Sequence, residues 1–235
     1  MQAVIPIAGK GKRMSQTHQG PKQLLPVAGQ PLVEYAIASL PVDIDELVLV
    51  VGGPHEQQIR EYFGTEHNGR RVTYVRQLEP LGLGHAIQQA APVVNGRFLV
   101  VLPDDLYAPE DLQAMIREPD LAVLAKRVER PEHFGVLVCD EAGCLVRAVE
   151  KPKEFVSDLV SAGSHMLDRE FFDVRVPPSA RGEIELPDLL MALVRERGRR
   201  VKVLEASFWM AVNDPEQLTK ADQEMLKRLS ASTKE

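Results

Sequence analysis

The sequence is poor in cysteine and contains no long apolar run. No stretch approaches the roughly 20 apolar residues that a membrane-spanning helix needs, and no basic segment followed by an apolar core opens the chain. We therefore expect no membrane partner and a cytoplasmic location. The two cysteines, Cys139 and Cys144, are expected to face each other across a hairpin. A disulfide there is possible, but the missing secretory signal favours two small apolar residues.

The chain also lacks an excess of positive charge, with 28 Lys and Arg against 34 Asp and Glu and a formal net charge of −6. Nucleic-acid and membrane-surface binders rely on a diffuse basic field, so the composition argues against both. The six histidines include no i, i+4 pair, and we predict no zinc site. With 235 residues the chain is long enough for one large α/β domain or two small ones, and its hydrophobic content of 44% is ordinary for a folded protein.

Positive charge is instead concentrated near the start of the chain. The apolar run Val4-Ile5-Pro6-Ile7-Ala8 leads into Gly9-Lys10-Gly11-Lys12-Arg13, and Pro21-Lys22 follows shortly after. Gly9 and Gly11 lack Cβ atoms, so successive N–H groups there can form a concave nest around a phosphate. The alternative is a plain turn with solvated lysines. The spacings typical of Rossmann and P-loop motifs are absent.

Strands alternate with helices in the first half of the chain. We expect strands at 46–51, 71–75 and 97–102, and helices at 31–39, 56–63 and 85–91. This alternation predicts an α/β fold with a Rossmann-like, doubly wound, mostly parallel sheet. Ligands bind at the carboxyl ends of the strands in such a sheet, where the glycine loop and Asp104-Asp105 both fall.

The pattern changes at about residue 121. Closely spaced strands at 121–126, 135–139, 144–150 and 159–167 predict antiparallel strands added to the parallel sheet. Helices are expected at 186–197 and 215–229, around a strand at 200–206. We expect a single domain covering 1–235, with two functional halves that divide near residue 120.

Asp104 and Asp105 directly follow the most apolar strand of the chain. Carboxylates at this position are hard oxygen ligands, which suit Mg²⁺ held together with phosphate oxygens. Asp105 could instead cap a helix that starts near Pro109, or the pair could simply form a turn. The residues alone leave these alternatives open.

Taken in order, these motifs resemble those of the sugar nucleotidyltransferases. The run from Ala8 to Met14 is similar to the family's Ala-Gly-x-Gly-x-Arg-Met/Leu signature, and the run from Pro21 to Leu32 is similar to the Pro-Lys and Leu-x-Pro-Val-x-Gly-x-Pro-Leu segments that follow it. Lys12 stands where the family usually carries Thr. The resemblance, which extends to about Leu218, implies an enzyme that joins a sugar 1-phosphate to UTP or dTTP with Mg²⁺ and releases pyrophosphate.

The resemblance also implies how the nucleotide is bound by the half covering 1–120. The backbone at Ala8, Gly9 and Gly11 would hold phosphates, while Arg13 and Lys22 would act as catalytic cations. The segment 77–86 resembles the base-contacting segment of the uridylyl and thymidylyl branches, which gives base contacts to two residues, Gln77 and Gly82. An amide can donate and accept at once, as the pyrimidine edge requires. The alternative is a polar turn before a helix.

A second metal ligand is implied near the end of the chain. Val212-Asn213-Asp214 resembles the N-acetylglucosamine 1-phosphate uridylyltransferase branch, whose Asn binds metal, so Asn213 would join Asp104 as a ligand to Mg²⁺. The thymidylyl branch places a metal-binding Asp where this chain has Ala211. Asn213 or Asp214 could also cap the last helix, and both roles could coexist.

The half covering 121–229 would bind the sugar phosphate. Glu150-Lys151-Pro152 resembles a family motif in which the glutamate accepts sugar hydroxyls and the lysine, here the third catalytic residue, contacts the phosphate. Similar segments imply that Gly135, Gly163 and Glu183 line the sugar pocket. The run 161–163 lacks the Asn that the N-acetylglucosamine branch places just before that glycine. Ala162 therefore makes N-acetylglucosamine a less secure substrate.

Three other functions compete with this hypothesis. A glycosyltransferase also uses acidic metal ligands, but it has little reason for the polyphosphate loop from Gly9 to Lys22. A cytidylyl- or guanylyltransferase of the same fold is closer, and a non-catalytic nucleotide-sugar-binding protein is conceivable because of Lys12, Ala162 and Ala211. We expect small-molecule substrates as partners, no nucleic acid and possible homo-oligomers. The sugar, the choice between UTP and dTTP, and the oligomeric state stay open.

Overall fold

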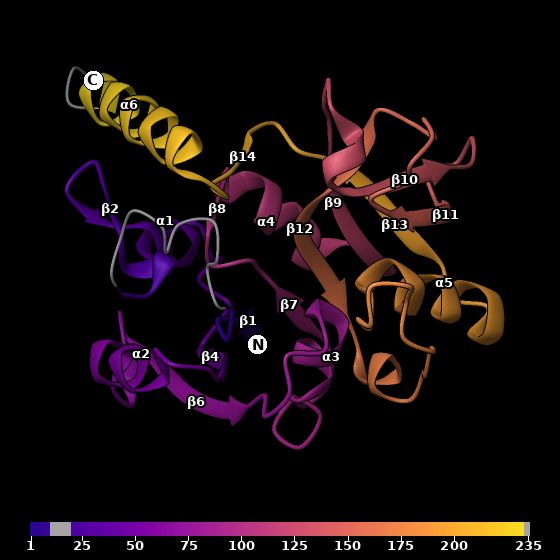
Figure 1. The fold of residues 1–235 in the computed structure, drawn as a ribbon, viewed down its shortest axis with the longest axis horizontal. Coiled ribbons are helices and arrows are strands. Elements are labelled where there is room, and N and C mark those ends of the chain that lie inside the picture. Colours follow the sequence, from indigo (N-terminus) through magenta and orange to yellow (C-terminus); the bar gives the residue numbers. More distant parts are fainter. Residues whose placement is uncertain (10–19, 233–235) are drawn as a thin grey trace.

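The computed structural model describes residues 1–9 and 20–232, and within them ten strands form one mixed sheet (Figure 1). These strands are β1 (Gln2–Pro6), β4 (Glu46–Val51), β5 (Glu66–His67), β6 (Arg70–Arg76), β7 (Phe98–Val100), β9 (Leu121–Arg127), β10 (Gly135–Cys139), β11 (Leu145–Glu150), β12 (Leu159–Leu167) and β13 (Val201–Glu205). Their order is β11-β10-β12-β7-β1-β4-β6-β5, while β9 pairs with β12, and β13 pairs with β9.

The first half of the chain forms the parallel part of the sheet. Strand β1 lies between β7 and β4, and β4 pairs with β6, all in parallel. Every residue of β4 is buried, as expected for a central parallel strand that is covered on both faces. The prediction of a doubly wound, mostly parallel sheet is confirmed.

Helices cover both faces of the sheet. Helices α1 (Leu32–Ala38), α2 (Glu56–Phe63) and α4 (Pro109–Arg117) pack into one apolar core, and α3 (Leu83–Gln88) and α5 (Leu186–Arg197) pack into the other. Helix α6 (Pro215–Ser232) packs on the hairpin of β2 (Pro26–Val27) and β3 (Gln30–Pro31). None of the helices in this part of the chain is long and apolar enough to cross a membrane.

Strand β12 joins the two halves of the molecule. One edge of β12 pairs with β10 at Val160 and with β7 from His165 to Leu167, while its other edge pairs with β9. The register shifts between Ser161 and His165, which marks a β-bulge. The predicted antiparallel addition is confirmed, because β9, β10 and β11 all run antiparallel to a neighbour.

Several local predictions differ from the structure. Strand β7 ends at Val100 instead of 102, and α3 starts at Leu83 instead of 85, directly after Gly82 with its φ of +99°. Two unexpected strands, β8 (Asp105–Tyr107) and β14 (Trp209–Ala211), form an antiparallel pair beside the main sheet. The described residues also form three short 3-10 helices, which are η1 (Lys22–Leu24), η2 (Pro131–His133) and η3 (Arg169–Phe172).

The two cysteines are free, as the preferred interpretation of the sequence holds. Cys139 ends β10 and Cys144 is buried just before β11, where a guanidinium nitrogen of Arg200 lies 3.5 Å from its sulfur.

Candidate active site

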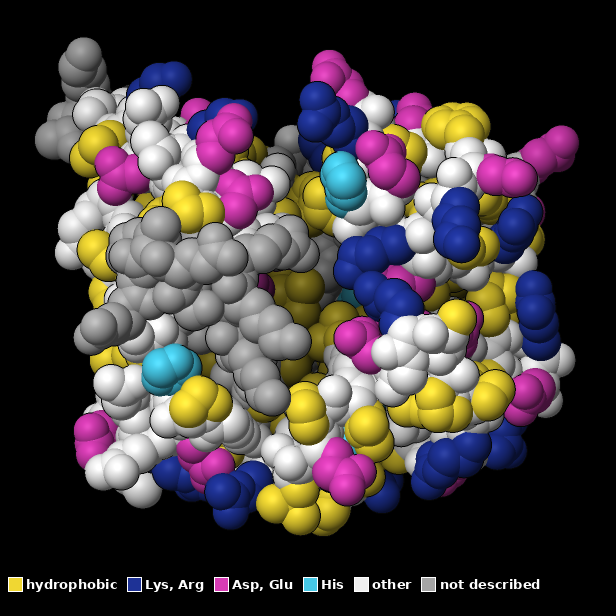
Figure 2. Space-filling view, viewed as in Figure 1, with side chains coloured by type: hydrophobic (Ala, Val, Ile, Leu, Met, Phe, Trp, Pro, Cys, Tyr) yellow, Lys and Arg dark blue, Asp and Glu magenta, His cyan; other side chains and the backbone are white. Residues whose placement is uncertain are grey.

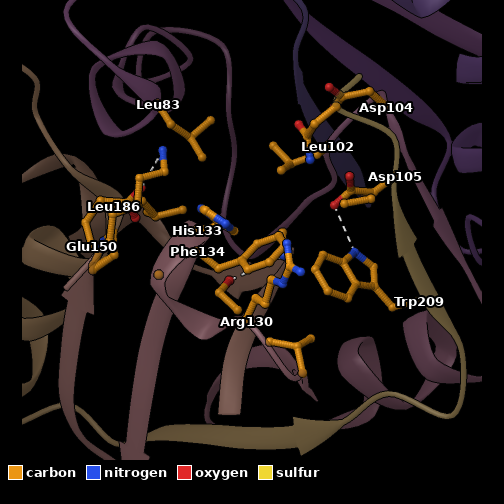
Figure 3. Close-up of a pocket in the computed structure, with 18 of the residues that line it drawn as sticks. Leu83, Leu102, Asp104, Asp105, Arg130, His133, Phe134, Glu150, Leu186 and Trp209 are labelled. Carbon is orange, nitrogen blue, oxygen red and sulfur yellow. Dashed lines mark hydrogen bonds and ion pairs between the residues drawn. The ribbon is translucent and has the colours of Figure 1, made fainter. Parts of the chain in front are cut away.

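A cavity of about 980 Å³ opens where the two halves of the chain meet. Its walls include Asp104, which follows β7, and Asn213, which follows β14, together with Gly135, Glu150 and Gly163 from β10, β11 and β12. Figure 2 shows the face of the molecule hollowed at its centre, with basic side chains along one wall. In Figure 3, Asp104 and Trp209 lie on one side of the cavity, and Glu150 and Leu186 lie on the opposite side.

Asp104 in the cavity wall forms a nearly buried ion pair with Lys22, which does not itself line the cavity. The Nζ atom of Lys22, in η1, contacts the Oδ2 atom of Asp104, and the two side chains are only 8% and 20% exposed. The structure thus brings together two residues that lie 82 positions apart in the chain. We call Lys22, Asp104 and Asn213 the Lys22–Asp104 rim.

Asn213 lies beside Asp104 because the backbones of the two segments are paired. The N–H of Val212 donates to the carbonyl oxygen of Asp104 at 3.0 Å, continuing the β8–β14 pairing. Asp214 caps α6, since its Oδ1 accepts the N–H of Gln217 at 2.8 Å. The capping role therefore belongs to Asp214, and the side chain of Asn213 is left to line the cavity.

The oxygen atoms at this rim fit a hard divalent cation. Asp104 and Asn213 offer a carboxylate and an amide oxygen, and Mg²⁺ is usually held by one or two such ligands together with substrate phosphates and water. Among the described residues, no group of three or more His, Cys, Asp or Glu side chains could hold a metal ion. A cage made of protein carboxylates alone is therefore absent from this part of the chain.

Asp105 differs sharply from its neighbour Asp104. Its carboxylate is buried and accepts a hydrogen bond from Trp209 Nε1 at 2.9 Å, which ties β8 to β14. Burial, reinforced by the charge of Asp104, raises the pKa of Asp105 well above its usual value. The alternative that Asp105 caps a helix is wrong, because α4 starts after Ala108 without a side-chain cap.

The residues predicted to bind the nucleotide lie at the ends of the neighbouring parallel strands. A Cβ atom at Gly52, after β4, would lie 2.6 Å from the carbonyl oxygen of Gln77 and 3.4 Å from the Cβ of Ala8. Ala8, Gly52 and Gln77 therefore lie next to one another, each just after the end of its own parallel strand. Gly9 follows directly and is exposed, whereas Gly11 and Arg13 lie outside the described residues.

The side-chain amide of Gln77 is engaged within its own loop. It is 8% exposed, donates to the carbonyl oxygen of Gly82 at 3.2 Å, and lies 3.0 Å from His85 Nδ1. Neither Gln77 nor Gly82 lines the 980 Å³ cavity. Their role in base contact stays a prediction.

Gly82 lies at a close seam between two predicted substrate segments. The N–H of Ile184 donates to Leu81 at 2.7 Å, and the N–H of Gly84 donates to Ile184 at 3.0 Å. A Cβ atom at Gly82 would lie 2.8 Å from the Cβ of Glu183. Only glycine fits there, so the segment predicted to contact the base and the segment predicted to contact the sugar touch through their backbones.

The opposite side of the cavity carries a network of charges. Arg181 donates to Glu185 at 2.8 Å and lies 3.4 Å from both Glu150 and Glu183. Lys151 Nζ lies 3.2 Å from Glu150. We call these five residues the Arg181 cluster, and it contains three of the residues predicted from sequence: Glu150, Lys151 and Glu183.

Two predicted glycines shape this side. Gly135 pairs with Glu150 across the β10–β11 hairpin, and a Cβ atom there would lie 3.1 Å from a Glu150 carboxylate oxygen. Gly163 forms the bulge of β12 with a φ of +75°, where a Cβ atom would lie 2.6 Å from Leu102. Both glycines line the cavity.

Sequence reasoning missed other residues that line the cavity. Arg181 directly precedes the predicted Gly182-Glu183 segment, so its place next to that motif was the available signal. Ser161 and His165 lie on either side of the bulge and carry no local signal, because strand register decides which of their neighbours face the cavity.

Comparisons of the sequence and of the structure with known proteins agree on one family. The sequence model of a family described as "Nucleotidyl transferase" matches residues 2–228. The chain is 33% identical over 234 residues to the bifunctional protein GlmU of Methanococcus maripaludis, and the match covers 97% of this chain and 55% of the relative. The chain thus spans about half the length of the curated relatives of this kind.

Two further relatives match along their whole length or nearly so. The UTP–glucose-1-phosphate uridylyltransferase AglF of Haloferax volcanii is 31% identical, over 99% of this chain and 100% of the relative. A crystal structure of a candidate glucose-1-phosphate thymidylyltransferase from Bacillus anthracis, in complex with sucrose, superposes with a TM-score of 0.83. It is 27% identical, and 94% of each chain is covered.

Proposed function

This chain belongs to the nucleotidyl transferase family, and from that premise we propose that it transfers the nucleotidyl group of UTP or dTTP to a sugar 1-phosphate, with Mg²⁺ as cofactor. Relatives named for uridylyl and thymidylyl transfer support a pyrimidine nucleotide as the donor. The reaction would yield a nucleotide-diphosphate sugar and pyrophosphate.

One observation carries the proposal: a single cavity is lined on one side by Asp104, which pairs with Lys22, and by Asn213, and on the other side by the Arg181 cluster. The rim presents a cation and two oxygen ligands, which suits a polyphosphate. The cluster presents carboxylates that can accept hydroxyl protons and cations that can hold a phosphate, which suits a sugar 1-phosphate. Two anionic substrates could therefore meet between them.

The reaction needs no nucleophile from the protein. A phosphate oxygen of the sugar 1-phosphate attacks the α-phosphorus of the nucleotide, and the bond to the β-phosphate breaks. Pyrophosphate leaves with the bonding electron pair. The protein accelerates this step by aligning the reactants and by stabilising charge.

Each side of the cavity has a separate task. Lys22, held against Asp104, stabilises negative charge at the α-phosphate, while Lys151 holds the attacking phosphate. Glu150 and Glu183 accept hydroxyl groups of the sugar. Arg13 and the backbone near Gly9 and Gly11 hold the leaving phosphates.

Asp104 and Asn213 would hold the Mg²⁺ ion at the rim. When bound, a divalent cation supplies charge neutralisation between phosphate oxygens. Asp105 is not assigned to this ion, because its carboxyl group is buried and one of its oxygens accepts the hydrogen bond from Trp209.

The test is a matrix of ATP, CTP, GTP, UTP and dTTP against the 1-phosphates of glucose, galactose and N-acetylglucosamine, with released pyrophosphate as the readout. We expect turnover with a pyrimidine nucleotide and loss of turnover after chelation of divalent ions. Pyrophosphate release only with CTP or GTP would instead support the related transferases of the same fold. Binding of substrates without release would support a non-catalytic protein.

A further inference from the structure

A second groove lies outside the candidate active site, between β11 and α5, which are neighbours in Figure 1. It encloses about 440 Å³ and shares no lining residue with the 980 Å³ cavity. Residues 147–149 of β11 line one side, residues of α5 line the other, and Val176 and Pro177 complete the lining. Spaces of this size hold small molecules in many proteins. We call this space the β11–α5 groove.

The two walls of the groove run in opposite directions. Gly135 pairs with Glu150, the last residue of β11, and a Cβ atom at Gly135 would lie 3.2 Å from Pro187, in the first turn of α5. The end of β11 therefore lies beside the start of α5, and the helix runs back along the strand. Arg195 is about 12 Å from Pro187 along the helix, and Arg147 is about 10 Å from Glu150 along the strand. The two arginines thus lie at the same end of the groove.

This end of the groove carries positive charge. The side chains of Arg147 and Arg195 are exposed, and neither forms an ion pair or a hydrogen bond with another described residue. Glu196 lines the same end, so one net positive charge remains there. Guanidinium groups bind carboxylates through parallel N–H donors. The charge and the chemistry of this end suit a carboxylate with a single negative charge.

The opposite end of the groove presents a hydrogen-bond acceptor. Asp188 lies seven positions before Arg195, so the two side chains share one face of α5 about 10 Å apart. The carboxyl group of Asp188 is partly buried and accepts no hydrogen bond from any described residue. Burial, reinforced by the charge of Glu185, raises the pKa of Asp188. A donor group from a ligand would compensate this carboxyl group.

The floor between the two ends is apolar. Met191 and Ala192 from α5 and Ala148 from β11 line it, and all three side chains are buried. An occupant that follows the floor would therefore have an apolar body between an anionic end and a donor end. The order of these three features along the groove defines the chemical class of the occupant.

Each wall of the groove continues within three residues into the Arg181 cluster. Val149 directly precedes Glu150, and Asp188 follows Glu185 by three positions. Pro177 precedes Ser179 by two positions, and the Ser179 hydroxyl donates to Glu185 at 2.7 Å. A molecule that holds these walls together would also restrain the side of the active site that carries the cluster.

We propose that the β11–α5 groove binds a small amphiphilic carboxylate, and that this occupant favours binding of the sugar 1-phosphate in the main cavity. The carboxylate lies between Arg147 and Arg195, the apolar body covers Met191, and a hydroxyl or ammonium group donates to Asp188. An occupied groove orders the walls in advance, so the sugar 1-phosphate loses less conformational entropy when it binds. The site does not depend on the proposed function, whereas its effect on the sugar rests on it.

Calorimetry of the whole chain with 3-(4-hydroxyphenyl)propionate tests the site, because this probe carries a carboxylate, an apolar ring and a hydroxyl donor in that order. Its methyl ester, which lacks the charge, should bind about 10-fold more weakly. 3-Phenylpropionate, which lacks the donor, should bind about 3- to 10-fold more weakly. Absence of saturable binding, or equal affinities for the three molecules, would overturn the proposal.

Substitutions locate the bound probe. Arg147→Ala and Arg195→Ala should each weaken binding of the carboxylate by about 5- to 10-fold and leave binding of the ester unchanged. Asp188→Ala should remove the difference between the probe and 3-phenylpropionate. Arg197→Ala is the matched control, because Arg197 is exposed on the same helix and lines neither the groove nor the main cavity.

Thermal unfolding shows whether these variants keep the fold. Unchanged binding in folded Arg147→Ala and Arg195→Ala variants would place the probe elsewhere and overturn the site. An equal loss in Arg197→Ala would reduce the effect to general charge attraction and also overturn it.

The effect on the sugar side is measured separately. A saturating concentration of the probe should lower the Kd for glucose 1-phosphate by about 5-fold, and glucose 1-phosphate should lower the Kd for the probe by the same factor, because coupling between two sites is reciprocal. The Kd for the nucleotide should not change, and Arg195→Ala should abolish the coupling. Binding of the probe with an unchanged or higher Kd for glucose 1-phosphate would overturn the effector role. If the wild type releases no pyrophosphate with any substrate pair, the proposed function fails, while the probe titrations still test the groove.

Discussion

The Lys22–Asp104 rim and the Arg181 cluster place charge in the same cavity in different ways. At the rim, one ammonium group that is 8% exposed meets one carboxylate. In the cluster, a guanidinium that is 41% exposed is shared among three carboxylates. Removing one partner of a buried pair leaves the other charge buried and uncompensated, whereas the remaining charges of a shared network still have partners. We therefore expect the rim to tolerate substitution poorly and the cluster to tolerate much of it.

The largest effect is expected at the rim. Lys22→Ala and Asp104→Ala should each lower kcat by roughly 10²-fold or more, the scale of losing one preorganised group at a developing charge. Pyrophosphate release measures the rate, and thermal unfolding shows whether the fold persists.

Lys202→Ala and Asp120→Ala are the matched controls, because their partners, the carbonyl oxygen of Ala142 and the guanidinium group of Arg200, do not line the cavity. Rates like those of the wild type in both rim variants would contradict the assignment of this side to phosphate chemistry.

A second prediction concerns His165, on the strand that runs between the two regions. Its folded-state pKa of about 4 lies below the ordinary value of 6.5, so the unfolded chain binds the proton first as the pH falls. This contribution to stability is complete above pH 6.5 and is lost between pH 6.5 and pH 4. It amounts to at most about 3 kcal/mol.

Urea unfolding of the wild type and of His165→Gln across this pH range measures the effect. The wild type should lose more stability than the variant as the pH falls. Parallel pH dependence of the two proteins would show that His165 does not titrate as its burial requires.

A smaller effect is expected at Lys151, which is 40% exposed and pairs only with Glu150 in the described part of the chain. Lys151→Ala should raise the KM for the sugar 1-phosphate by about 10-fold, because a charge-assisted hydrogen bond to a phosphate is worth about 1.5–3 kcal/mol at most. The KM for the nucleotide should stay the same. An equal rise in both KM values would mean that the two sides are not separate.

The smallest effect should distinguish two carboxylates that share Arg181. Glu183→Gln should change kcat/KM by no more than about 5-fold, since the amide oxygen can still accept a sugar hydroxyl and the exposed ion pair that is lost contributes about 0–1 kcal/mol. Glu185 is buried and also accepts a hydrogen bond from Ser179 at 2.7 Å. Glu185→Gln should therefore cost about 1–3 kcal/mol in unfolding free energy. Equal unfolding free energies of the two variants would show that the burial of Glu185 does not make its ion pair more important for stability than that of Glu183.

Local patterns predicted most of the fold. The bounds of β4, α2, β10, β12 and α5 match the predictions to the residue, because apolar periodicity and turn residues fix such elements locally. The β8–β14 pair was missed. Its strands are three residues long and pair positions about 100 residues apart, such as Tyr107 with Trp209, which no local period can reveal.

The candidate site was predictable only where motifs carry the information. Glu150 ends a strand, Asp104 and Lys151 follow strands, all three lie in recognisable segments, and the structure places them at one cavity. Ser161 could not be distinguished from Ala162, because the bulge and the register of β12 decide which of the two faces the cavity. The division into functional halves and the residue roles stay predictions.

The seam at Gly82 sets a rule for how this molecule can be re-engineered. Its two hydrogen bonds join Leu81 and Gly84 to Ile184 through the main chain, so they impose geometry without constraining the side chains at those positions. A loop transplanted in place of residues 77–86 would have to keep a glycine at 82, because the Cβ atom of Glu183 and the backbone of Ile184 fill the space beside it. Chimeras that exchange 77–86 and 181–186 as one cassette should therefore fold more readily than chimeras that exchange either loop alone.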